Sequence, residues 1–116
     1  MGITGEVTAQ DRRIWQIQAN IALCELLSEA HKAELEPITW RVFDGRHLQG
    51  RIDNPLLGVV ERRVLFGQWA AFLKAGQVTE TPSLSDVRLV ARDCLRRRDV
   101  AVTLVCDIPL TPGDEP

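Results

Sequence analysis

Residues 38–53, ITWRVFDGRHLQGRID, limit the possible folds of this chain more than any other stretch. Apolar and polar side chains alternate on both sides of an Asp-Gly pair, and alternation with a period of two is typical of strands with one buried face. Asp-Gly between two such runs is a strong signal for a turn. The stretch therefore predicts a β-hairpin.

Two registers are possible for this hairpin. A two-residue turn at 44–45 would place the apolar residues of the two strands on opposite faces, whereas a three-residue loop at 44–46 would gather them on one face. We prefer the three-residue loop because it buries one face, and we expect Trp40 to lie over the bare Gly50. Its expected pairs are Val42 with Leu48, Trp40 with Gly50 and Ile38 with Ile52. The other face would carry Thr39, Arg41, His47, Gln49 and Arg51.

A long helix is predicted before the hairpin. Thr8 and Asp11 resemble the capping box that begins many helices, with Asp in place of the usual Glu or Gln. The helix should run from about residue 9 to about residue 34. It has two apolar seams that are turned from each other: Ile14, Ile17, Ile21 and Cys24 form the first, and Trp15, Ala22 and Leu26 form the second.

These two seams predict self-association. A helix of that span is about 37 Å long, and a domain of this size has a radius of gyration of only about 13 Å. One sheet cannot cover both seams, and a seam left in water would expose a larger apolar patch than most monomers carry. We therefore expect a homodimer with a two-fold interface on this helix. The expected interface residues are Ile14, Ile17, Ile21, Trp15 and Leu26.

A second helix is predicted after the break at Asn54-Pro55. It should run from about residue 57 to residue 75, with Gly76 as its C-terminal stop. Gly67 inside it costs about 1 kcal/mol relative to alanine, so we expect close packing there. The apolar face of this helix comprises Leu65, Phe66, Trp69, Phe72 and Leu73.

The last part of the chain predicts at least one strand. Residues 99–108 alternate apolar and polar side chains, which is typical of a strand. Residues 84–97 fit either a helical stripe or a strand, and we choose the strand because Leu89 falls outside the stripe and the segment is rich in valine. The turn between the two strands would then be Arg96-Arg97-Arg98.

The predicted order is helix, hairpin, helix, hairpin. This order indicates an α+β fold, with a mostly antiparallel sheet and two helices on one face. Residues 1–108 would form a single domain. Residues 109–116 are acidic and rich in proline, so we expect a disordered tail.

Several short stretches resemble small proteins of actinobacteria and their phages. The stretches are LEPITW at 35–40, LQG at 48–50, Glu61-Arg62-Arg63 followed by Phe66 and Trp69, LVA at 89–91, and a valine-rich final strand. The resemblance implies a strand over 86–95 and a cytoplasmic location in a host with a GC-rich genome. It implies no catalytic residue.

Composition and short motifs argue against several classes of protein. No apolar run approaches the roughly 20 residues that span a bilayer, and the first residues lack the pattern of a secretory signal. The three cysteines include no C-x-x-C pair, which argues against a disulfide framework and a zinc site and indicates a reduced, cytoplasmic protein. The chain has no glycine-rich phosphate motif. We therefore expect no metal and no cofactor.

A catalytic cysteine would need a histidine as its base, and the candidates are His31 and His47. We expect Cys24 and Cys106 to lie in the core, where cysteine is a common small apolar residue, and Cys94 to lie near an exposed turn. With no recognised motif around any of them, we expect no catalytic residue and no enzyme.

A cluster of arginines suggests an alternative function. The cluster comprises Arg92, Arg96, Arg97 and Arg98, with Arg41, Arg46 and Arg51 as further candidates. A basic β-ribbon can enter the major groove of DNA, so a nucleic-acid-binding protein is the alternative. The net charge of −2 and the neighbouring Asp93 and Asp99 favour a solvated turn instead. We therefore expect a non-enzymatic interaction or regulatory protein that acts as a homodimer, with a further protein partner that the sequence does not identify.

Overall fold

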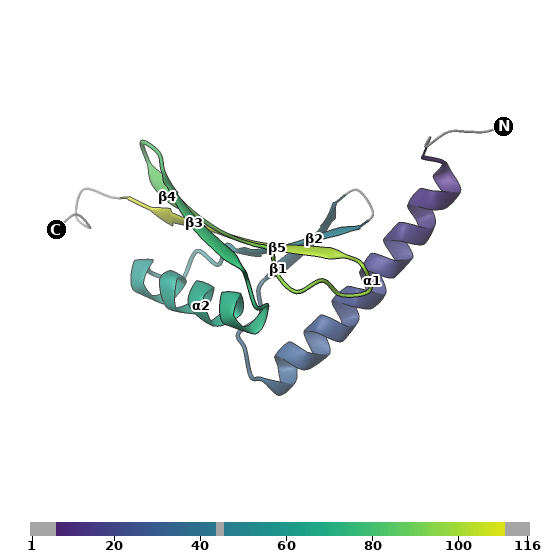
Figure 1. Cartoon of the computed structure of the whole chain (residues 1–116). Helices are drawn as coiled ribbons and strands as arrows, with labels where there is room; N and C mark the ends of the chain where they lie inside the picture. Colours follow the sequence, from purple (N-terminus) through teal and green to yellow (C-terminus); the bar gives the residue numbers. More distant parts are fainter. Residues whose placement is uncertain (1–6, 44–45, 111–116) are drawn as a thin grey trace.

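The computed structural model describes residues 7–43 and 46–110 (Figure 1). Two helices and five strands follow one another along the chain. They are α1 (Ala9–Lys32), β1 (Thr39–Phe43), β2 (His47–Ile52), α2 (Val59–Phe72), β3 (Gln77–Pro82), β4 (Asp86–Arg92) and β5 (Ala101–Pro109). The α+β class is therefore confirmed.

The five strands form one mixed sheet in the order β1-β2-β5-β4-β3. The β1–β2, β4–β5 and β3–β4 pairs are antiparallel, and the central β2–β5 pair is parallel. The expected helix, hairpin, helix, hairpin order misses β3. That strand lies at the edge of the sheet and is exposed along most of its length, so it has no apolar alternation to reveal it. It ends at Pro82, a residue that edge strands tolerate.

The first hairpin has the register that its apolar pattern predicts. Trp40 lies opposite Gly50 and Val42 lies opposite Leu48. A methyl group at Gly50 would come within 3.0 Å of the Trp40 ring, so the indole does lie over the bare glycine. Phe43 pairs with His47, which leaves the three-residue connection 44–46. The structure of residues 44–45 lies outside the described ranges.

The core lies between one face of the sheet and the two helices, which occupy the same side (Figure 1). Trp69 of α2 is almost fully buried, and its indole N–H donates to the Glu36 carbonyl oxygen at 3.0 Å. Its ring meets that of Trp40 edge-on, with 5.8 Å between ring centroids. The sheet contributes, among others, Leu48, Ile52, Leu89, Leu104, Cys106 and Ile108.

The helix ends follow local rules. The capping box of α1 is confirmed: the Asp11 N–H donates to the Thr8 hydroxyl, and the Thr8 N–H donates to the Asp11 carboxylate. Beyond the C-terminus of α2, Lys74 occupies the left-handed position with φ 56°, so the expected stop at Gly76 is wrong. The close packing expected at Gly67 is also wrong, because a methyl group there would meet nothing within 4 Å.

The described chain is elongated. Its radius of gyration is 16.5 Å, compared with about 13 Å for a compact domain of this length. Residues 9–18 of α1 contribute no buried residue, and this half of the helix extends past the sheet (Figure 1). Of the expected tail, Pro109 belongs to β5 and the Leu110 N–H donates to the Ser85 carbonyl oxygen. Residues 111–116 lie outside the described ranges.

Candidate interaction surface

An apolar stripe runs along the outer side of α1. Ile14, Ile17 and Ile21 are 44%, 58% and 42% exposed, and Cys24 continues the row at the same spacing. We call these four residues the outer stripe. The buried row of α1 comprises Ala19, Ala22, Leu26 and Ala30. At 3.6 residues per turn, the two rows lie on opposite sides of the helix, so the outer stripe faces away from the sheet.

The structure divides the expected interface residues between the two sides of α1. The isoleucines of the outer stripe are exposed, as a surface for a second copy requires. Leu26 is fully buried against the sheet, so it cannot contact a second copy. Trp15 is half-buried, and the Arg46 guanidinium lies 5.0 Å from its ring centroid. The core location expected for Cys24 is also wrong, because its side of the helix faces outward.

These corrections have one physical cause. Periodicity shows that α1 has two apolar seams, but it does not show which seam meets the sheet. The side that meets the sheet is the buried row, which shares Ala22 and Leu26 with the second seam and adds the alanines at 19 and 30, whereas Trp15 is only half-buried. The larger isoleucines remain outside.

The arginine turn is bound to α1. The Arg97 guanidinium donates to Glu29 at 2.9 Å, and the Arg98 guanidinium donates to both oxygens of Glu25 at 2.8 and 3.0 Å. Each pair is bidentate, the strongest geometry for an arginine and a carboxylate. The hydrogen bonds lower the pKa of Glu25 and of Glu29. We call these two ion pairs the clamp. It was not predicted from the sequence, although the four-residue spacing of Glu25 and Glu29 places both carboxylates on one side of the helix.

The clamp changes how the arginine cluster is interpreted. Two donors of Arg97 and two of Arg98 are already engaged by carboxylates, whose negative charges oppose a phosphate. Arg96 lies beside Asp99 and donates to its carbonyl oxygen at 3.1 Å. Arg92 is exposed at the end of β4, on the other face of the sheet. The geometry therefore does not favour the β-ribbon alternative.

The sheet face opposite the helices carries the paired valines Val90 and Val105 and polar side chains that bond to one another. The Asp107 carboxylate accepts hydrogen bonds from Arg88 at 2.8 and 3.1 Å and from Arg51 at 3.2 Å. The hydrogen bond from Arg88 lowers the pKa of Asp107. His47 lies 2.9 Å from the Thr103 hydroxyl across the β2–β5 pair. The expected polar face of the first hairpin is therefore a set of contacts between neighbouring strands.

Arg62 of α2 supports the same region from the helix side. Its guanidinium donates to the carbonyl oxygens of Leu57, Asn54 and Asp107 at 3.1, 3.1 and 2.9 Å. These bonds join the start of α2 to the loop before it and to β5. Only the position of Arg62 near the N-terminus of the helix could have suggested this role.

Two of the three thiols are buried. Cys106 is fully buried, as expected, and Cys94 does lie beside the exposed segment that begins at Leu95, but its own side chain is only 6% exposed. Burial raises the pKa of both thiols and disfavours the reactive thiolate. Within residues 7–43 and 46–110, no three His, Cys, Asp or Glu side chains gather as metal ligands would. Over the same ranges, no helix is long and apolar enough to cross a membrane.

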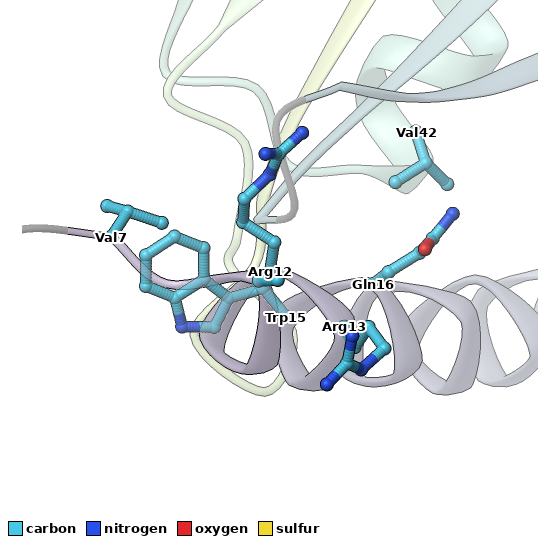
Figure 2. A pocket seen from close by; sticks show the side chains of 7 residues that line it. Val7, Arg12, Arg13, Trp15, Gln16 and Val42 are labelled. Atoms are coloured by element: carbon cyan, nitrogen blue, oxygen red, sulfur yellow. The ribbon is translucent and has the colours of Figure 1, made fainter.

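An open hollow of about 700 Å³ lies between the start of α1 and the first hairpin (Figure 2). Arg12 and Arg13 lie near its rim, and Trp15 and Val42 form apolar parts of its wall. The other lining residues are Val7, Ala9 and Gln16. Among the described residues that line it there is no carboxylate, thiol or imidazole, the groups that acid–base or nucleophilic catalysis uses.

No family model, curated protein or solved structure matches this chain. Any function must therefore be inferred from the exposed surfaces of this chain. Among those surfaces, the outer stripe of α1 carries three exposed isoleucines and a thiol at regular spacing, whereas Val60 and Val64 form a smaller exposed apolar pair on α2.

Proposed function

We propose that this chain is a small non-enzymatic interaction or regulatory protein that acts as a homodimer in the cytoplasm. The observation that carries the proposal is the outer stripe, a row of three exposed isoleucines on a helix whose opposite side is fixed to the sheet. Such a surface is self-complementary when two copies meet about a two-fold axis. The exposed thiol of Cys24 and the buried thiols of Cys94 and Cys106, all unpaired, suit a reducing compartment.

The energetics favour a weak to moderate dimer. Each isoleucine of the outer stripe is about half exposed, so burying its exposed half in the interface contributes about 1 kcal/mol to association. A two-fold interface uses every residue twice. The stripe is nevertheless smaller than a standard interface of about 1,600 Å². The six isoleucines together therefore contribute about 6 kcal/mol, which corresponds to a dissociation constant of about tens of micromolar.

Light scattering or sedimentation at a concentration well above the expected dissociation constant, about several hundred micromolar, tests the proposal. We expect a mass of twice 13.0 kDa for the natural chain and 13.0 kDa for the Ile14→Glu, Ile17→Glu variant. Val60→Glu is the matched control, because Val60 is 73% exposed but lies on α2, away from the outer stripe. It should remain a dimer.

Two results would contradict the proposal in different ways. A natural chain that sediments at 13.0 kDa would exclude the homodimer. A dimer that persists in the Ile14→Glu, Ile17→Glu variant would exclude the outer stripe as its interface.

A further inference from the structure

We infer that the two copies of α1 pair antiparallel, with the two-fold axis passing beside residue 19. The inference rests on the proposed homodimer and assigns the geometry of its interface. In this arrangement Ile14 faces the partner's Cys24, and Ile17 faces the partner's Ile21. The occupant of the outer stripe is thus the same stripe in the second copy, with the helix running the other way.

The spacing of the outer stripe is symmetric about one point. Ile17 and Ile21 lie two residues on either side of position 19, and Ile14 and Cys24 lie five residues on either side of it. An antiparallel pair centred there therefore brings all four residues into register at once. The next positions of the repeat are Gln10 and Ser28, nine residues on either side of position 19. Gln10 therefore faces the partner's Ser28, and polar residues border the interface at both ends.

The composition of the outer stripe disfavours a parallel dimer. In a heptad repeat Ile14 and Ile21 occupy position a and Ile17 occupies position d. Isoleucine at both a and d of parallel helices favours trimers or tetramers over dimers. A parallel pair would also place the two positive N-terminal ends of the helices side by side. An antiparallel pair sets each N-terminal end beside a negative C-terminal end, which stabilises it.

The anchoring of α1 points the same way. Residues 9–18 contribute no buried residue within one chain, whereas the second half of α1 contains the buried row and the clamp to Arg97 and Arg98. Antiparallel pairing lays the less buried half of each helix along the more buried half of the other. A parallel pair would leave both less buried halves extending together past the sheets, as the single copy does in Figure 1.

Thiol cross-linking separates the two orientations, because Cys24 is the exposed cysteine of the three. In the antiparallel pair the two Cys24 residues lie ten residues apart along the axis, about 15 Å. A disulfide needs Cα atoms within roughly 7 Å, so the natural chain should not cross-link under oxidised glutathione. Ile14→Cys should cross-link, through a bond between positions 14 and 24 that peptide mass spectrometry identifies.

Ile14→Cys, Cys24→Ser is the matched control, because within the outer stripe it carries a thiol at position 14 alone, and Cys94 and Cys106 are buried. In the antiparallel dimer it should stay uncross-linked by itself but form a covalent dimer when mixed with the natural chain. Far-ultraviolet circular dichroism and thermal melts of each variant verify that the fold is retained.

The outcomes distinguish this inference from the proposal on which it rests. Cross-linking of the natural chain through two Cys24 residues would establish the parallel orientation and overturn the inference while keeping the dimer. A dimer by light scattering that never links positions 14 and 24 would also overturn it. A monomer by light scattering would instead remove the proposed function itself.

Discussion

The contact between Trp40 and Gly50 makes a quantitative prediction about stability. A methyl group added at Gly50 would lie 2.9 Å from Cδ1 of Ile38 and 3.0 and 3.1 Å from two carbons of the Trp40 ring. The first distance is shorter than real Cβ atoms show, so the flexible end of the Ile38 side chain must shift, and the indole must give way by a few tenths of an ångström. Since Trp40 also packs edge-on against Trp69, the indole has little room to move.

Two opposing effects determine how much Gly50→Ala changes the free energy of unfolding. Overpacking a filled site costs about 1–3 kcal/mol. Replacing a glycine inside a strand by alanine gains about 0.5–1 kcal/mol, because the unfolded chain loses freedom. We therefore expect the free energy of unfolding to fall by about 1–2 kcal/mol, which lowers the melting temperature by about 5–10 °C.

Urea denaturation followed by tryptophan fluorescence measures this change. Gly67→Ala is the matched control, because a methyl group on that exposed helical glycine meets nothing. It should raise the free energy of unfolding by up to about 1 kcal/mol. Alanine should therefore lower the free energy of unfolding at Gly50 and raise it at Gly67.

Trp40→Phe tests the cause of the loss, because phenylalanine lacks the two ring carbons closest to the added methyl group. The indole N–H of Trp40 is buried with no acceptor among the described residues, so this substitution removes no hydrogen bond. Gly50→Ala should cost less in the Trp40→Phe background than alone. A neutral or stabilising Gly50→Ala, or one whose cost is unchanged by Trp40→Phe, would refute the reasoning.

Two further predictions concern the charged side chains that join the elements. Arg62→Met keeps the apolar stem but removes the donors to three carbonyl oxygens, and urea denaturation should show a loss of about 1.5–3 kcal/mol; an unchanged midpoint would show that water replaces the guanidinium. Because Arg88 lowers the pKa of Asp107 in the folded chain, this carboxylate stabilises the fold above its unfolded pKa of about 3.9, and the contribution is lost as the pH falls through the folded pKa. Asp107→Asn should therefore lower stability at neutral pH and reduce the dependence of the urea midpoint on pH below about 4; an equal acid dependence in both proteins would contradict this assignment.

The features that were predicted correctly depend on neighbours in the sequence. The capping box at Thr8 and Asp11 involves one turn of helix, and the hairpin register follows from alternation in sixteen consecutive residues. The strand over 86–92 was also recognised from its own pattern, although its partner β3 was not. An exposed edge strand carries too few apolar residues for a pattern to show.

The features that were missed depend on contacts between distant segments. Which seam of α1 meets the sheet follows from the fit of its alanines against the strands, and no local pattern encodes that fit. Cys94 is buried because the Leu95 N–H donates to the Leu73 carbonyl oxygen and draws the segment toward the end of α2. For the outer stripe, the sequence predicted the isoleucines, and the structure was needed to separate them from Leu26.

The parallel pairing of β2 and β5 has a consequence for the order of folding. β2 meets β1 across three residues, but His47 lies opposite Ala101, which follows only after α2, β3 and β4 have been passed. Closing a loop of about 50 residues costs more entropy than closing a tight turn, so this contact should form late. During synthesis on the ribosome, β2 therefore carries an unpaired edge until the final strand emerges. Until then that edge can pair with strands of other chains, so the last nine-residue strand, rather than the core that precedes it, protects the nascent protein from aggregation.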